Sequence, residues 1–227
     1  MAFDLGLGRK LDFLLDGEKP GLIPTRDWKK SVYNDRWYDG ETVIAAIGQG
    51  YVLTTPLQLA VMTAAVANGG EVLRPRVLRR IESLDGEVLV EGSKEVLRTV
   101  ELDPEQLREV KKGLEAVVNE PHGTGWATKL KEVRVAGKTG TAQVIRRKST
   151  AEEEAETGKD KTPYRFRDHA LFVSYAPADN PQIAVAVVVE HGRHGSSAAA
   201  PIARAIYENY FHIEPAKELD NPGYLGD

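Results

Sequence analysis

The segment with the clearest pattern of apolar side chains runs from Pro56 to Ala67, "PLQLAVMTAAVA". It is apolar on nearly every face, which predicts a helix that is buried on most sides. Thr55 suits the N-cap, Pro56 suits the first helical position, and Gln58 stands where a capping box places its second member. The glycines that follow Asn68 suit the end of a helix, where the chain often adopts a left-handed conformation.

Two further helices are predicted. Asp103-Pro104 opens one of them, and apolar side chains then recur on one face, at Leu107, Val110, Leu114, Val117 and Val118. The other covers the closing "SSAAAPIARAIYENYF" at 196–211, with Ser196 or Ser197 near its N-cap. "NEPHGTG", which follows the first of these helices, is interpreted as the turn that ends it. Residues 1–50 are only weakly periodic, which predicts irregular structure around a short helix.

β-prone runs predict a hairpin and then a sheet. The hairpin covers 76–92, where Asp85-Gly86 is typical of a type I′ turn. The sheet takes strands at about 132–145, 169–176 and 182–190, and the last two are joined by a short turn. We expect residues 146–167 to form a mobile connection and 213–227 a polar tail. The fold class is therefore α/β (α+β type), with an antiparallel sheet flanked by helices.

The strand at 182–190 predicts that this sheet is incomplete. Its "IAVAVVVE" is continuously apolar, which is typical of a strand that is covered on both faces in the middle of a sheet. Such a strand needs a neighbour on each side, and the turn supplies only residues 169–176. No other segment is an obvious second neighbour, unless a piece of 71–92 serves. An uncovered apolar edge would also favour self-association.

The composition of the chain excludes several classes of function. The 227 residues carry a net charge of -4, which argues against nucleic acid as the main ligand, because binding it depends on neutralising phosphates. The absence of cysteine excludes disulfides, thiolate zinc sites and a cysteine nucleophile. The longest helix-like apolar stretch falls short of the roughly 20 residues that cross a bilayer. The first residues lack the pattern of a signal peptide, so any targeting element is expected to lie outside this chain.

Two motifs suggest ligand chemistry that the surrounding residues do not support. His191 and His194 have the H-x-x-H spacing of some zinc sites, but glycines interleave them and no third ligand is evident nearby, so we expect no metal. Gly137-Lys138-Thr139 invites a phosphate-loop interpretation, whose pattern is G-x-x-x-x-G-K-[ST]. The first glycine of that pattern would be residue 132, which is Glu132. The residues that follow are β-prone rather than helical, which also argues against a phosphate loop.

The same residues fit an edge strand that lines an active site. Alternation places Thr139 and Thr141 on one face of the strand and Lys138 on the other. A glycine within a strand, such as Gly140, often marks the close approach of a ligand or of another backbone. A lysine with two hydroxyls is a plausible site for an acyl substrate that bears a carboxylate.

Larger motifs place this strand in a family. The chain resembles the C-terminal part of the transpeptidase domain of class B penicillin-binding proteins, most closely the penicillin-binding protein 2 group. The resembling segments are "GLIPTRDWKK", "WYDGETVIAAIGQGYVLTTPLQLAVMTAAVANGG", "AGKTGTAQV" and "HALFVSYAPADNPQIAVAVVVEHG", together with the closing helix. They cover most of residues 1–211, so 1–227 is expected to be one C-terminal portion of that domain.

The resemblance implies an acyl-serine mechanism on peptidoglycan stem peptides, and inhibition by β-lactams. It implies that Lys138 bridges the serine of an S-x-N motif and the substrate carboxylate. Thr139, Gly140 and Thr141 would bind the substrate or a β-lactam, and the backbone N–H of Thr141 would form half of the oxyanion hole. No organic cofactor is expected.

The resemblance implies three motifs, of which K-T-G is present as Lys138-Thr139-Gly140, whereas S-x-x-K and S-x-N do not occur in the 227 residues. We therefore expect a C-terminal fragment that is inactive alone. The whole protein is expected on the cell-wall side of the cytoplasmic membrane, beside a glycan-polymerising membrane protein. Two alternatives stay open. One is a non-catalytic interaction module that pairs through its open sheet edge, and the other is part of a β-lactamase or D,D-carboxypeptidase relative.

Overall fold

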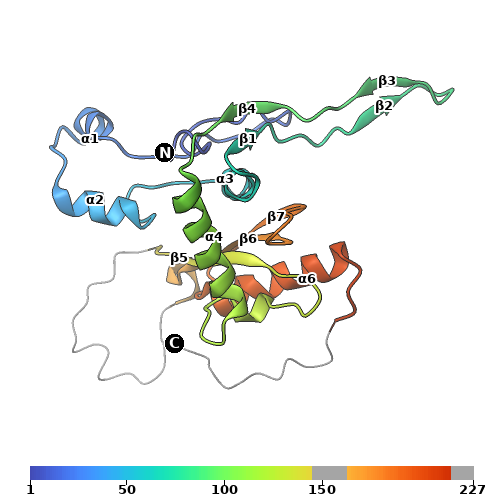
Figure 1. The fold of residues 1–227 in the computed structure, drawn as a ribbon. Coiled ribbons are helices and arrows are strands. Elements are labelled where there is room, and N and C mark those ends of the chain that lie inside the picture. Colours follow the sequence, from blue (N-terminus) through green and yellow to red (C-terminus); the bar gives the residue numbers. More distant parts are fainter. Residues whose placement is uncertain (145–162, 216–227) are drawn as a thin grey trace. The chain divides into compact units, whose positions relative to one another are not determined.

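The computed structural model describes residues 1–144 and 163–215, and the chain divides into two compact units (Figure 1). One unit comprises Met1–Glu109 and the other Val110–Asp227, so the division falls inside helix α4 (Pro104–Asn119). Among the described residues, no helix is both long and apolar enough to cross a membrane.

The first unit combines short helices with two small antiparallel sheets. Its helices are α1 (Arg26–Tyr33), α2 (Asp39–Ala46) and α3 (Pro56–Asn68). Strands β1 (Glu71–Leu73) and β4 (Val96–Thr99) pair with each other, and β2 (Arg80–Glu82) pairs with β3 (Val88–Glu91) to form the long hairpin of Figure 1.

The predicted ends of α3 are confirmed. The Thr55 hydroxyl accepts the Gln58 N–H, the Gln58 side chain accepts the Thr55 N–H, and Gly69 ends the helix in the left-handed region. Gln58 is buried, and the cost of burying its amide is offset because the amide also donates to the carbonyls of Arg9 and Pro20, 2.8 Å away in each case. One side chain thus caps α3 and fixes the irregular N-terminal segment to it.

Three predictions for the first unit need correction. Residues 1–50 form two short helices rather than one. No type I′ turn forms at Asp85-Gly86, because Gly86 alone of the pair has a positive φ, and the Gly86 N–H instead bonds the Ser83 carbonyl. Pieces of 71–92 do not extend the main sheet, since β1 pairs with β4 and β2 with β3.

The second unit holds the main sheet, in the order β5-β6-β7. The strands are β5 (Ala136–Ala142), β6 (His169–Ala176) and β7 (Ile183–Val189), and all of them are antiparallel. Short helical turns precede or follow them: η1 (Trp126–Thr128), η2 (Tyr164–Phe166) and the π-helical η3 (Gly195–Ala199), which leads into α6 (Ala200–Tyr210).

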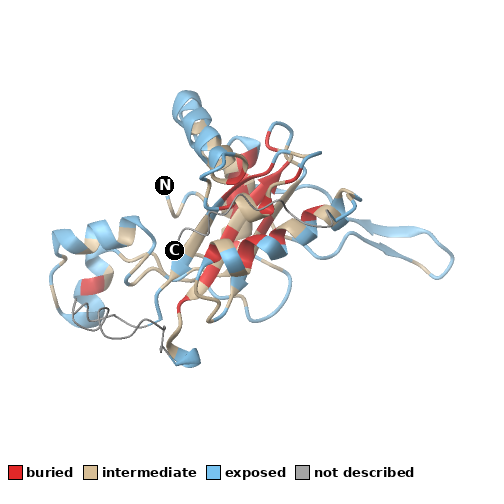
Figure 2. Ribbon diagram, turned by 90° about the horizontal axis from the view of Figure 1, so that it is seen from below, coloured by how far each residue is buried: buried red, intermediate tan, exposed pale blue. Residues whose placement is uncertain are grey.

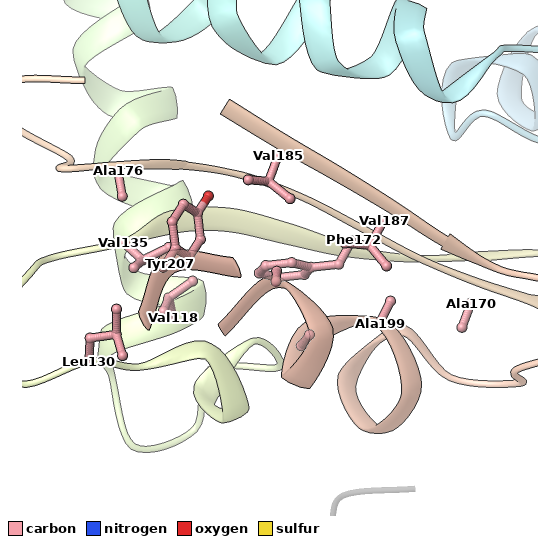
Figure 3. Packing of buried hydrophobic residues seen from close by; sticks show 12 residues of the cluster. Val118, Leu130, Val135, Ala170, Phe172, Ala176, Val185, Val187, Ala199 and Tyr207 are labelled. Atoms are coloured by element: carbon pink, nitrogen blue, oxygen red, sulfur yellow. The ribbon is translucent and has the colours of Figure 1, made fainter. Parts of the chain in front are cut away.

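One face of this sheet packs on the C-terminal helix and forms the larger core. The buried residues gather on the sheet and α6, as Figure 2 shows in red. Figure 3 shows the side chains of Phe172 and Tyr207 among Val118, Val135 and Val187. The core therefore joins α4, β5, β6, β7 and α6 into one body.

The predicted sheet is confirmed, with changes at its ends. The first strand is shorter than the predicted 132–145, whereas the second covers the predicted 169–176. Within the described residues β7 pairs with β6 alone, and it alternates between buried Val185 and Val187 and exposed Val188. Within the described residues it is therefore an edge strand with one partly exposed face, and the predicted position in the middle of a sheet, covered on both faces, is wrong for this structure.

The closing helix is confirmed, but its predicted serine cap is wrong. The chain enters α6 through the π-helical turn η3, and Ala199 occupies the N-cap position without a side-chain hydrogen bond. Most of the predicted mobile connection at 146–167 and most of the predicted tail at 213–227 lie outside the described residues.

Candidate active site

The register of β5 against β6 sorts the predicted site residues onto two faces. Thr139 lies opposite Phe172 and Thr141 opposite Ala170, and both partners are buried on the face that packs on α6. Lys138 lies opposite Val173, on the other face. Directly opposed residues of an antiparallel pair point to the same side. The predicted separation of the lysine from the two threonines is therefore confirmed.

β5 presents these residues along an unpaired edge. In the described parts of the chain, β6 is the only strand that pairs with β5. The Lys138 side chain is exposed, and its Nζ donates to the Thr139 carbonyl at 2.9 Å. A cationic group therefore lies against the backbone of β5 at Thr139.

Thr139 has a side-chain partner that sequence reasoning missed. Its Oγ1 lies 2.9 Å from Oγ1 of Thr124, and either hydroxyl could be the donor. Thr124 belongs to the loop between α4 and η1, which the sequence identified only as a turn. Thr124 is exposed and Thr139 is partly buried, so the pair lies at the surface of the second unit.

Close backbone packing requires glycine at two positions beside the site. A Cβ on Gly195 would lie 2.3 Å from the Leu171 carbonyl oxygen and 2.8 Å from that of Gly140. A Cβ on Gly137 would lie 2.7 Å from the ring of Phe172. η3 therefore packs directly on the backbone of β5 and β6 at Gly140, and no side chain separates them.

The start of β5 is fixed to the end of α4. The Asn119 amide donates to the Val135 carbonyl at 2.8 Å and to the Glu115 carbonyl at 2.7 Å. Lys129 Nζ donates to the Asn119 carbonyl at 3.0 Å. These bonds position the strand that carries the lysine and the threonines.

Two tyrosines are buried at the main sheet, Tyr175 of β6 and Tyr207 of α6. Tyr207 of α6 donates its hydroxyl to Ser174 Oγ at 2.7 Å, and both side chains are fully buried. Burial raises the pKa of Tyr207, although the hydrogen bond to Ser174 acts in the opposite direction. Burial also raises the pKa of Tyr175 to about 12, and the negative charge of Glu115 adds to this effect. Both phenols therefore remain neutral at physiological pH.

The two histidines considered for a metal have different environments. The His191 N–H donates to His169 Nδ1 at 2.9 Å, and the rings of His169 and His191 lie 4.9 Å apart. His194 precedes η3. Across residues 1–144 and 163–215, no cluster of three metal-ligating side chains occurs.

The fold and this strand agree with a known family. The penicillin binding protein transpeptidase domain matches residues 1–208. The chain belongs to this family. Peptidoglycan D,D-transpeptidase MrdA of Haemophilus influenzae is 38% identical over 213 residues, which are 92% of this chain and 32% of that protein. This transpeptidase-domain chain thus spans about a third of the length of that curated relative.

Solved structures support the same assignment. Pseudomonas aeruginosa PBP2, in complex with WCK 5153, is similar with a TM-score of 0.73 and 37% identity, over 98% of this chain and 46% of that one. A chain of a peptidoglycan synthase complex that coordinates polymerization and crosslinking gives a TM-score of 0.70 and 34% identity, over 96% of this chain and 33% of that one. The fold is therefore that of penicillin-binding protein transpeptidases, and the family works in cell-wall peptidoglycan synthesis.

Proposed function

We propose that this chain forms the K-T-G wall of the active site of a peptidoglycan D,D-transpeptidase. One observation carries the proposal. Lys138, Thr139, Gly140 and Thr141 occupy a strand that pairs with β6 alone among the described strands, and the Lys138 side chain is exposed. The relatives named D,D-transpeptidase support the reaction class.

The chemistry of these groups suits the carboxylate end of a stem peptide. The Lys138 ammonium supplies positive charge, and the hydroxyls of Thr139 and Thr141 supply hydrogen-bond donors. A backbone N–H of β5, that of Thr141, would stabilise the oxyanion that forms when the acyl carbonyl is attacked. Penicillins carry a carboxylate beside their reactive amide, so the same groups would bind them.

The nucleophile of this reaction would come from outside the 227 residues. A serine oxygen attacks the penultimate D-alanine carbonyl and the bond to the terminal D-alanine breaks. The serine proton passes to the leaving nitrogen, so that free D-alanine departs and an acyl-serine ester remains. Neither an S-x-x-K nor an S-x-N motif occurs in the 227 residues. The chain alone therefore binds the carboxylate side of the substrate but does not become acylated.

Intact mass spectrometry tests whether the nucleophile lies outside this chain. The chain is incubated with excess benzylpenicillin, beside a chimera in which it replaces the matching segment of the Haemophilus influenzae transpeptidase. We expect no adduct on the chain and one penicilloyl group on the chimera, at the serine of its S-x-x-K motif. An adduct on the chain itself, or a chimera that is folded by circular dichroism but stays unmodified, would contradict the proposal.

The partner and location follow from the same proposal. The similar chain from a peptidoglycan synthase complex supports a glycan-polymerising membrane protein as the partner of the whole protein. Such a partner would place the whole protein on the cell-wall side of the cytoplasmic membrane. Copurification of the polymerase with the chimera, but not with an unrelated transpeptidase domain, would support it.

A second candidate is a non-catalytic module that pairs through β7. The specific observation is its outer edge, which no strand covers within the described residues, where Val188 is 36% exposed. Sedimentation of the chain decides between the candidates. Self-association that Val188→Lys abolishes would favour pairing through this edge, and a monomer at all concentrations would count against it.

A further inference from the structure

We propose that Thr124 is a positioning residue that orients the Thr139 hydroxyl toward the carboxylate of the substrate or β-lactam. The inference rests on the proposed function of β5. Its basis is the 2.9 Å contact between the two hydroxyl oxygens. Thr124 lies outside the K-T-G strand, in the loop that follows α4, and neither the family match nor the resemblance assigns it a role.

The loop holds Thr124 in place through its backbone. The Gly125 N–H donates to the Val117 carbonyl at 2.9 Å, and the Trp126 N–H donates to the Gly123 carbonyl at 3.1 Å. A Cβ on Gly123 would lie 2.1 Å from the Val117 oxygen, so the loop packs directly on the end of α4. Both neighbours of Thr124 are therefore fixed, and its hydroxyl is presented to β5 from a rigid support.

The same elements are joined a second time. Asn119, at the end of α4, donates to the Val135 carbonyl just before β5. The α4 end and its loop thus contact β5 at Thr139 and the residue just before the strand, Val135. This double contact fixes the distance between Thr124 and Thr139, which a single contact from a free loop would not.

The hydrogen-bond chemistry gives the pair a direction. A threonine hydroxyl has one proton to donate and two lone pairs to accept. When Thr139 donates its proton to a carboxylate, its contact with Thr124 requires Thr124 to be the donor. The chain then runs from Thr124 to Thr139 to the carboxylate, and each bond polarises the next. Without Thr124, the Thr139 side chain would rotate among its staggered positions.

The first test uses the 227-residue chain itself. Scalar couplings measured by NMR report the side-chain rotamer of Thr139 in the wild type, in Thr124→Val and in Thr124→Ser. Valine keeps the shape without the hydroxyl, and serine keeps the hydroxyl. We expect one rotamer in the wild type and the serine variant, and averaging in the valine variant. A Thr139 rotamer that is unchanged in Thr124→Val would overturn the proposal.

The second test measures acylation of the chimera by benzylpenicillin and by its methyl ester, which lacks the carboxylate charge. Thr124→Val should weaken the reversible binding of benzylpenicillin by about three- to tenfold, as expected for one hydrogen bond, and leave the acylation step unchanged. Reaction with the ester should not change, and Thr124→Ser should restore benzylpenicillin binding. Equal losses for both compounds would show a merely structural role.

The variants Thr139→Val and Lys138→Ala distinguish a failure of this proposal from a failure of the proposed function on which it rests. If Thr139→Val weakens the reversible binding of benzylpenicillin and Thr124→Val does not, the role of Thr124 is wrong and that of β5 stands. If neither Thr139→Val nor Lys138→Ala changes acylation, the proposed function of β5 is wrong, and the role of Thr124 falls with it.

Discussion

At the scale of single residues, Lys29 is an unusual lysine because only 3% of it is exposed. Its Nζ lies 2.6 Å from Glu41 and 3.2 Å from Asp35, and 4.5 Å from the centre of the Tyr38 ring. Burial acts to lower the pKa of Lys29, but the hydrogen bonds with Glu41 and Asp35 outweigh it and raise the pKa. The lysine therefore remains charged and joins α1 to α2.

This cluster makes the first unit sensitive to acid. The hydrogen bond from Lys29 lowers the pKa of both Asp35 and Glu41 in the folded chain. A lowered carboxyl pKa contributes stability that is complete above the ordinary value of about 4 and is lost as the pH falls through the folded-state value. We expect the urea concentration at the midpoint of unfolding, followed by tryptophan fluorescence, to decrease as the pH is lowered below about 4. In Lys29→Met the unfolding midpoint should depend less on pH. An equally steep dependence on pH in this variant would contradict the role of the cluster.

Tyr207 allows a similar test in the second unit. Phenylalanine keeps the ring but removes the hydroxyl that donates to the buried Ser174. Loss of one partner of a buried hydrogen bond costs about 1–3 kcal/mol, because the other partner remains desolvated. Urea denaturation should show this loss for Tyr207→Phe. Tyr210→Phe, at an exposed position on the same helix, should stay within about 0.5 kcal/mol of the wild type.

At the scale of elements, the packing of η3 on β5 decides whether the site strand keeps its position. Gly195→Ala would place a methyl group 2.3 Å from the backbone of β6, so the turn or the strand must move. We expect a loss of about 2 kcal/mol or more, of the size seen for overpacking. Gly113→Ala, on α4 with nothing within 4 Å, should instead stabilise by about 0.5–1 kcal/mol. Equal effects of the two variants in thermal unfolding would contradict this account.

The elements predicted correctly from the sequence are those whose signals are local. α3 begins at Pro56 and ends at Asn68 because its capping residues and apolar pattern agree. The strands at 169–176 and 182–190 have long β-prone runs and a short turn between them. β1 and β4 were missed because each is a short strand, and their pairing joins residues separated by a whole hairpin.

The arrangement of the candidate site was predictable only where it depends on the sequence of a single strand. Alternation along one strand was enough to separate Lys138 from Thr139 and Thr141. Thr124 was not predictable, because its contact with Thr139 depends on how the α4 loop packs against β5. The packing of Gly195 on Gly140 is likewise tertiary. A glycine or threonine in a polar loop gives no local signal of such a contact.

At the scale of the whole molecule, the main sheet has one unpaired edge at β5 and another at β7 within the described residues. The two edges differ in chemistry. The β5 edge carries a lysine and threonine hydroxyls, whereas β7 is a run of alanine and valine. The first suits a charged ligand, and the second suits another strand. This difference is why β5 is proposed as the active-site wall and β7 only as a candidate pairing edge.

The rate at which benzylpenicillin acylates the chimera, with and without Lys138, tests the central claim most directly. Lys138→Ala should slow acylation by about a hundredfold or more, as expected when a charge that stabilises the reacting complex is removed. Lys131→Ala, which removes an exposed lysine just before β5, should leave the rate within about twofold. Equal rates for the two variants would contradict the assignment of β5 as the wall that binds the carboxylate.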